Sequence, residues 1–221
     1  MNYSIIIGDD HQLVRAGFAA LIERMADFEL VAEAATGWQV IDLVKQKRPD
    51  LVLLDVSMPE LNGLDALELI QRLDRPPKTI MISMHEESEY ARRALDRGAS
   101  GYILKDSAVP ELEIALRAAT RSEIYLSPRI AGAVLDDRRK PGGGAGSPLD
   151  RLTRRQRQVF QLLVEGRRTR EIAARLNVSV KTVESHRSNL AHRLGVSDLP
   201  GMTRLAIRYG LIPEENSSPD G

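Results

Sequence analysis

The chain has 221 residues, of which 43% are hydrophobic and 28% charged, a balance typical of a globular protein that buries a core. The sequence contains no cysteine, which excludes disulfide bonds, cysteine nucleophiles, iron–sulfur clusters and thiolate zinc sites. The 31 basic and 31 acidic side chains cancel, and no run approaches the about 18 apolar residues that a membrane span needs, so we expect no contact with membranes.

The neutral total conceals an uneven distribution of charge. Residues 1–135 hold 15 Lys and Arg against 21 Asp and Glu, a net charge of −6. Residues 149–213 hold 13 against 5, a net charge of +8. A small, strongly basic domain indicates a polyanionic partner.

Residues 136–148 are charged and rich in Pro and Gly, a composition typical of a flexible linker. A long loop inside one domain is the alternative, although such loops are uncommon. We therefore predict two domains. The predicted parts are a first domain at 1–122, a linker at 123–148 with a helical start and a Gly/Pro-rich end, a second domain at 149–213, and a flexible tail at 214–221.

The first domain alternates strand and helix patterns. Segments between its apolar runs have helical spacing, for example Leu64, Leu67 and Ile70. Such alternation predicts an α/β domain with a doubly wound parallel sheet of five strands. The predicted strands cover Ser4–Ile7, Glu29–Glu33, Leu51–Leu54, Thr79–Ser83 and Gly101–Leu104.

Polar side chains stand at the carboxyl ends of these strands, which is where open α/β sheets bind ligands. They are Asp9 and Asp10, Asp55, Ser83 and Lys105. Carboxylates that share a small volume repel one another unless a cation joins them, and hard oxygen ligands suit Mg²⁺. Lys105 would supply a point charge for a phosphate. Each residue taken alone could also have an unrelated structural role, as a strand-end cap or a solvated side chain. Because all five stand at the carboxyl ends of predicted strands, a single common site is favoured.

Five segments of the first domain form a known pattern: Asp9-Asp10-His11, Asp55–Pro59, Gly63, Ser83 and Gly101–Lys105. They resemble the receiver domain of two-component response regulators, over residues 1 to about 122. The stretches Asp10–Gly17 and Ser83–Glu86 resemble the NarL/FixJ class in particular. The resemblance implies a flavodoxin-like fold in which Asp55 accepts a phosphoryl group from a sensor histidine kinase. It further implies Mg²⁺ held by Asp9, Asp10, Asp55 and the Ser57 carbonyl, phosphate contacts from Lys105 and Ser83, and a switch formed by Ser83 and Tyr102.

The second domain shows only helical patterns. Thr153 and Gln156 have the spacing of a capping box before an apolar helix. A short second helix, a tight turn at residues 177–179 and a third helix from about Val180 then predict an all-α helix-turn-helix domain. A small helical bundle with a solvated polar face is the alternative. A last helix would carry Leu199, Met202 and Tyr209 as a dimer surface or as part of the core.

Leu152–Gln156, Glu171–Ala173, Thr182-Val183 and Leu194–Val196 resemble the LuxR-type DNA-binding domain, across nearly all of 149–213. One position departs from the pattern, because Gln156 stands where the family usually has Glu. The resemblance implies that the third helix contacts DNA. The contacts expected are phosphates for Lys181, Thr182 and Arg187, and bases for Glu184, Ser185 and Ser188.

The chain as a whole is predicted to be a cytoplasmic transcription factor switched by phosphorylation, and not a metabolic enzyme. Its expected partners are a sensor kinase, promoter DNA, a second copy of the chain and, as a further possibility, RNA polymerase. Two alternatives stay open. One is a constitutive DNA-binding protein whose receiver is an unphosphorylated dimerisation scaffold. The other is a phosphatase-type enzyme that turns over small phosphoesters with the same aspartate and Mg²⁺.

Overall fold

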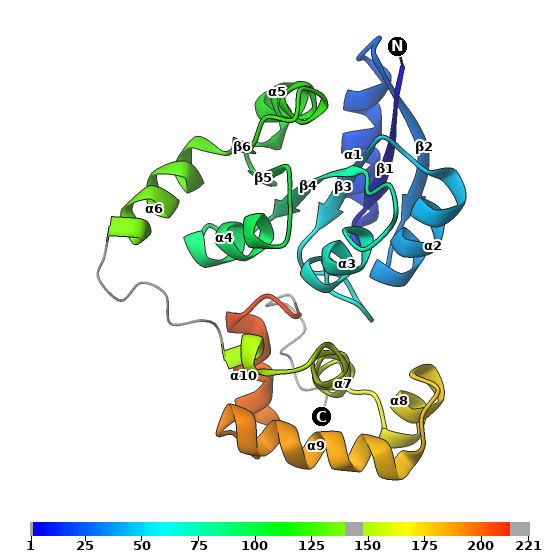
Figure 1. Cartoon of the computed structure of the whole chain (residues 1–221), viewed down its shortest axis with the longest axis vertical. Helices are drawn as coiled ribbons and strands as arrows, with labels where there is room; N and C mark the ends of the chain where they lie inside the picture. Colours follow the sequence, from blue (N-terminus) through cyan, green and yellow to red (C-terminus); the bar gives the residue numbers. More distant parts are fainter. Residues whose placement is uncertain (1, 140–147, 213–221) are drawn as a thin grey trace. The chain divides into compact units, whose positions relative to one another are not determined.

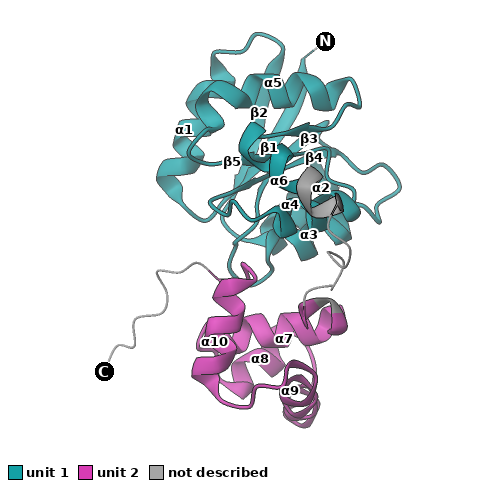
Figure 2. Ribbon diagram, turned by 90° about the vertical axis from the view of Figure 1, so that its left-hand side faces the viewer, with its two compact units in different colours: residues 1–143 teal, residues 144–221 magenta. Residues whose placement is uncertain are grey.

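The computed structural model describes residues 2–139 and 148–212. The chain divides into two compact units, residues 1–143 and residues 144–221 (Figures 1 and 2). The tail expected at 214–221 and the Gly-rich part of the expected linker lie outside the described residues. None of the helices in the described ranges has the length and hydrophobicity to span a bilayer.

The first unit contains a parallel sheet of six strands in the order β2-β1-β3-β4-β5-β6. The predicted doubly wound α/β fold is confirmed, with one strand more than the five expected. The additional strand, β6, has two residues and is too short to leave an alternating pattern in the sequence. The strands are β1 Tyr3–Gly8, β2 Phe28–Ala34, β3 Leu51–Asp55, β4 Lys78–Ser83, β5 Gly101–Leu104 and β6 Tyr125–Leu126.

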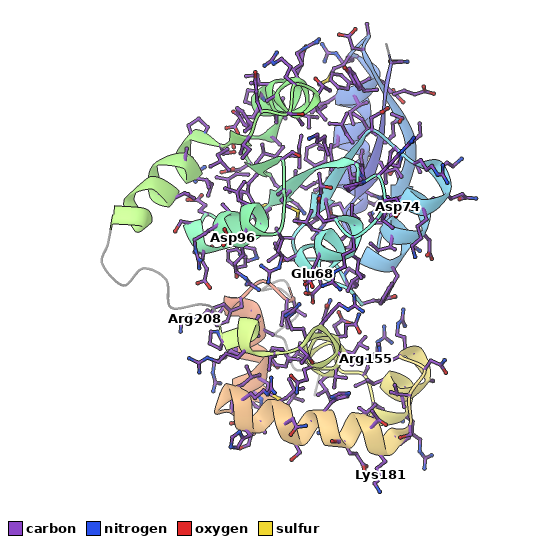
Figure 3. The ribbon with its side chains drawn as sticks, in the orientation of Figure 1. Glu68, Asp74, Asp96, Arg155, Lys181 and Arg208 are labelled. Carbon is purple, nitrogen blue, oxygen red and sulfur yellow. The ribbon has the colours of Figure 1, made fainter. Side chains whose placement is uncertain are left out.

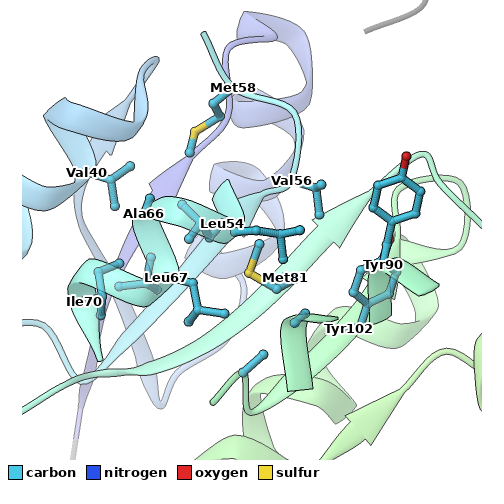
Figure 4. Packing of buried hydrophobic residues seen from close by; sticks show 14 of the residues in the cluster. Val40, Leu54, Val56, Met58, Ala66, Leu67, Ile70, Met81, Tyr90 and Tyr102 are labelled. Atoms are coloured by element: carbon cyan, nitrogen blue, oxygen red, sulfur yellow. The ribbon is translucent and has the colours of Figure 1, made fainter. Parts of the chain in front are cut away.

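Helices cover both faces of this sheet (Figure 1). Alternate residues of a strand point to opposite faces. Accordingly Ile5 and Ile7 belong to the core cluster that α1 and α5 cover, whereas Ile6 belongs to the cluster on the opposite face, which α2, α3, α4 and α6 cover. Figure 4 shows part of this second core, in which Leu54 and Met81 lie among side chains of α3 and α4. The helices are α1 Gln12–Glu23, α2 Gly37–Lys47, α3 Gly63–Ile70, α4 Ser88–Asp96, α5 Ala108–Thr120 and α6 Pro128–Arg139.

The segment 123–139, expected as the start of a linker, belongs to the first unit. It contains β6 and α6, so the helical start is present. Two apolar side chains of α6, Ile130 and Val134, are buried in the same core cluster as α4. The predicted first domain ends at residue 122 because the few large apolar positions of this short helix give too little periodicity to show that it is packed.

The second unit is built from helices throughout residues 148–212. Thr153 caps α7 in a complete capping box, because its hydroxyl accepts from the Gln156 N–H and the Gln156 side chain accepts from the Thr153 N–H. Val159, Phe160 and Leu190 are fully buried in its core. The predicted helix-turn-helix is confirmed as α8 and α9. The elements are η1 Pro148–Arg151, α7 Arg154–Val164, α8 Thr169–Arg175, α9 Val180–Leu194 and α10 Leu199–Arg208.

Candidate functional site

An acidic cluster lies at the carboxyl ends of β1 and β3. These two strands are neighbours with Gly8 opposite Leu54, so the residues that follow, Asp9 and Asp55, come side by side. Both are buried, with relative exposures of 0% and 2%. One ligand atom from each of Asp9, Asp10, His11 and Asp55 falls within 4.8 Å of the others. The structure therefore brings together the three carboxylates that the sequence predicted.

Lys105 reaches this cluster from the end of β5. Its Nζ lies 2.8 Å from Asp9 Oδ2 and 2.9 Å from Asp55 Oδ2, and only 7% of its side chain is exposed. Burial lowers the pKa of Lys105, but Asp55 and Asp9 outweigh that effect and raise it above its ordinary value, so the ammonium stays charged. One cation thus serves two buried carboxylates.

The electrostatics of Asp55 follow from this crowding. Burial raises the pKa of its carboxyl from 3.8 to about 7, Lys105 opposes that rise, and Asp9 and Asp10 add to it. Removing a charged group from water favours its neutral form, and a nearby like charge acts in the same direction. Asp55 therefore changes protonation near neutral pH unless a further cation joins the cluster.

Two oxygen atoms show that the cluster suits such a cation. Asp9 Oδ2 and Asp10 Oδ1 are buried, and within the described residues each faces a single nitrogen atom. Lys105 Nζ lies 2.8 Å from Asp9 Oδ2, and His11 Nδ1 lies 2.8 Å from Asp10 Oδ1. Three carboxylates against one ammonium leave an excess of negative charge. Oxygen donors of this kind are what Mg²⁺ prefers.

Backbone packing fixes the loop after Asp55. Gly63, the first residue of α3, lies so close to the main chain that a Cβ on it would fall 1.9 Å from the Asp55 carbonyl oxygen. Its N–H also donates to the Val56 carbonyl oxygen at 2.8 Å. The loop that carries Ser57 is thus closed back onto the end of β3, next to Asp55.

Ser83 and Tyr102 meet at the loop between β4 and α4. The Ser83 hydroxyl accepts a hydrogen bond from the His85 N–H at 3.0 Å, and the Tyr102 hydroxyl donates to the His85 carbonyl oxygen at 3.0 Å. Both side chains are buried, and burial raises the pKa of Tyr102. Lys105 belongs to the same group, since its N–H donates to the Ser83 carbonyl oxygen at 2.8 Å.

Two histidines near the cluster were not among the predicted site residues. His11 lies beside Asp9 and Asp10. Because it directly follows these two residues in the sequence, its place near the cluster could have been predicted. His85 Nε2 lies 3.3 Å from Ser57 Oγ, and its ring stacks on Tyr90 with centroids 4.4 Å apart. Only the fold reveals this second contact, because 28 residues separate the partners.

In the second unit, α9 presents most of the predicted DNA contacts to solvent. Figure 3 shows Lys181 pointing outward from this helix. Thr182 differs from the others, because it is half-buried and its hydroxyl lies 2.7 Å from Ser179 Oγ at the helix cap. The Arg187 guanidinium donates to Thr169 Oγ1 at 3.1 Å. The exposed positions are Lys181, Glu184, Ser185, Arg187 and Ser188.

The three residues considered as a dimer surface, two on α10 and Tyr209 directly after it, have different environments. Met202 is 7% exposed and belongs to the core of the unit. Tyr209 is half-buried against the same core, whereas Leu199 is 53% exposed. Of the three, only Leu199 presents a largely free apolar side chain.

Comparison with known proteins defines the class of protein to which this fold and site belong. Residues 5–117 match the response regulator receiver domain, and residues 150–206 match the luxR family of bacterial regulatory proteins. The chain belongs to the response regulators that join a receiver to a LuxR-type DNA-binding domain. The predicted family, fold class and regulatory role in transcription are thereby confirmed.

Individual relatives extend over nearly the whole chain. The transcriptional regulatory protein MctR of Rhizobium johnstonii is 33% identical and LiaR of Bacillus subtilis is 34% identical, each over 94% of this chain and at least 94% of the relative. The response regulator UvrY of Escherichia coli is 32% identical over 97% of this chain and 98% of its own length.

Solved structures agree with these matches. A LuxR-family response regulator from Aurantimonas is 34% identical, with a TM-score of 0.61 over 63% of this chain and all of that chain. RcsB of Salmonella enterica, solved on promoter rprA with the phosphomimetic BeF3⁻, is 26% identical, with a TM-score of 0.62 over 92% of this chain and 98% of its own.

Proposed function

We propose that this protein regulates transcription through phosphorylation of Asp55 by a sensor histidine kinase. The observation that carries the proposal is the buried contact of Asp55 and Asp9 with Lys105, in which one carboxylate is placed beside both a cation and a second acid. Carboxylates of this kind act as nucleophiles and form aspartyl phosphates.

The proposed reaction transfers a phosphoryl group between two side chains. An oxygen of Asp55 forms a bond to phosphorus while the bond from phosphorus to the kinase histidine nitrogen breaks, and that nitrogen keeps the electron pair. Lys105, already 2.9 Å from Asp55 Oδ2, offsets negative charge on the transferring group. Ser83, at the end of the neighbouring strand β4, supplies a hydroxyl to the group once it is attached.

Magnesium is the cofactor that suits the oxygen atoms of this cluster. Its ligands would be Asp9, Asp10, Asp55 and the Ser57 carbonyl. The bound ion would neutralise negative charge on the phosphoryl oxygens. Ionised Asp55 is the form that both the ion and the reaction need. Because a nearby cation lowers the pKa of a carboxyl group, metal binding would keep Asp55 ionised at neutral pH.

The proposed output is binding of promoter DNA by α9. Lys181 and Arg187 would contact phosphates, while Glu184, Ser185 and Ser188 would face base edges. Thr182 would contribute less, since its hydroxyl is engaged with Ser179. A homodimer is the matching assembly, because two-fold operators mirror two-fold proteins, and Leu199 is its exposed candidate contact. Action on promoter DNA is what supports a cytoplasmic location, and RNA polymerase is the further partner that such a role would involve.

The test is the intact mass of the full chain after incubation with Mg²⁺ and acetyl phosphate, followed by gel filtration. The wild type should gain one phosphoryl group and shift towards a dimer, and Asp55→Asn should do neither. Asp96→Asn is a matched control, because this carboxylate is exposed and pairs only weakly with Arg92 at 3.7 Å (Figure 3). The proposal fails if Asp55→Asn is labelled like the wild type, or if the wild type stays unlabelled while a control receiver is labelled.

A further inference from the structure

Helix α6 is tied to the two loops that follow the proposed phosphate ligands, Ser83 and Lys105. In its first turn, Arg129 forms ion pairs with Asp106, at 2.6 Å between Nη1 and Oδ2, and with Glu86 through Nη2. Asp106 directly follows Lys105, and Glu86 lies three residues after Ser83. One guanidinium thus joins the loop after β4 to the loop after β5.

A second tie lies just before the helix, at Ser127. This residue is fully buried, and its N–H donates to the Tyr102 carbonyl oxygen at 3.0 Å. Its hydroxyl oxygen accepts from the Leu104 N–H at 3.0 Å and donates to Glu111 of α5. The start of α6 is therefore held by the stretch of β5 that leads directly into Lys105.

The body of α6 packs against α4 (Figure 1). Ile130 and Val134 are buried in the same cluster as Tyr90 and Ala94 of α4. Tyr90 in turn stacks on His85, which bonds to Ser83 and Tyr102 through its main chain. Contacts from Arg129, Ser127 and α4 thus all connect α6 to the proposed phosphorylation site.

We propose that α6 is the output element of the first unit, and that Arg129 is the positioning residue that makes α6 follow the two loops. This inference rests on the proposed phosphorylation of Asp55. A phosphoryl group adds a charge of about −1.5 to −2 beside Lys105 and Ser83. The loops that carry Glu86 and Asp106 adjust to this charge, and the planar guanidinium passes their displacement to α6. Helix α6 is the last described element before the second unit, so its position controls where the chain leaves the receiver.

The experiment compares Arg129→Ala with Arg121→Ala in the full chain. Arg121 is a matched control, since it is an exposed arginine of the same unit whose ion pair, with Glu123 at 3.0 Å, stays within its own turn. Each protein is labelled with Mg²⁺ and acetyl phosphate, and its labelled fraction is measured by intact mass. Amide hydrogen exchange of residues 129–134 then reports on α6. Affinity for a DNA duplex, selected by the wild-type protein from a random oligonucleotide pool, reports on output.

Arg129→Ala should be labelled at Asp55 as fully as the wild type. Its α6 amides should exchange about five-fold faster before labelling, the size expected for losing one exposed ion-pair network. Phosphorylation increases the DNA affinity of each protein by some factor. In Arg129→Ala this factor should be about one fifth of the wild-type factor or smaller, which is a typical size for coupling between two sites. Arg129→Lys should recover part of this gain, because an ammonium replaces the charge without the planar fork, and Arg121→Ala should behave as the wild type.

The proposal is overturned if Arg129→Ala is labelled normally and keeps the full gain in DNA affinity, or if Arg121→Ala loses the gain equally. Failure of the phosphorylation hypothesis gives a different result, in which the wild type itself takes up no phosphoryl group. In that case hydrogen exchange still tests whether Arg129 stabilises α6. Unchanged exchange of the α6 amides in Arg129→Ala would show that it does not.

Discussion

Replacing Asp55 with Asn should stabilise the protein at pH 8 when no Mg²⁺ is present. In the wild type, Asp9 and Asp55 are buried together against the single ammonium of Lys105. Burial, with Asp9 as a further cause, raises the pKa of Asp55 from 3.8 to about 7. The folded protein therefore binds this proton more tightly than the unfolded chain, and ionising Asp55 costs folding free energy.

The sign and the pH window follow from this shift. A carboxyl group with a raised pKa in the folded state makes stability fall as the pH rises from about 4 to about 7, after which the loss is complete. A shift of about 3 pKa units at 1.36 kcal/mol per unit sets an upper limit of about 4 kcal/mol. Asn carries no charge at any pH and is spared this loss. Since the amide no longer pairs fully with Lys105, we expect a net gain of about 2 kcal/mol at pH 8.

Calorimetry of the full chain measures this gain as a change in the melting temperature of the first unit. For a domain of this size, about 2 kcal/mol corresponds to an increase of about 6 °C. More than half of the increase should disappear at pH 5, where the folded wild type keeps Asp55 protonated. Asp96→Asn controls for removing an exposed carboxylate. The reasoning is refuted if Asp55→Asn melts at or below the wild-type temperature at pH 8, or if its gain is the same at both pH values.

Three further changes test other parts of the structure. Lys105→Met should lower the stability of the first unit by about 3 kcal/mol at pH 8, because it leaves buried carboxylates without their cation, and by less at pH 5, where Asp55 is neutral; equal losses at the two pH values would contradict this. Thr153→Ala should destabilise the second unit by about 1 kcal/mol in thermal unfolding, since it removes the capping box, and an unchanged second transition would count against the cap. Lys181→Ala should weaken binding to the selected duplex and reduce the salt slope of log K by about 1, whereas an unaltered slope would exclude a phosphate contact.

The sequence could predict the composition of the site because parallel strands place their carboxyl ends at one edge. Asp9, Asp55 and Lys105 each follow a strongly apolar run, so the pattern alone located them at strand ends. Neither apolar runs nor spacing determines which strands are neighbours. The contact between Asp9 and Asp55 depends on β1 pairing with β3, which only the folded chain shows.

The region after residue 122 was predicted less well, for a different physical reason. Its strand has two residues, and its helix buries two apolar side chains in the part that is described, so neither element produces a clear period. The position of this segment is fixed by hydrogen bonds and ion pairs to residues far away in the sequence. Ser127 bonds to Leu104 across 23 residues, and Arg129 reaches Glu86 across 43. Exposed charges and single serines carry no periodic signal, so contacts of this kind become visible only in the folded chain.

The energetics of the acidic cluster explain why a local charge change can move distant parts of the unit. A core that gathers Asp9, Asp55 and Lys105 is less stable at neutral pH than one that leaves Asp55 neutral, and such exceptions to good packing are expected at functional sites. Any cation or phosphoryl group that enters the cluster changes the charge balance on Lys105. Lys105 and Ser83 are joined through their main chains, and Arg129 pairs with the loop that follows each of them. In the proposed coupling, a new charge balance at Asp55 therefore acts on α6 through these two loops and the ion pairs that Arg129 forms with them.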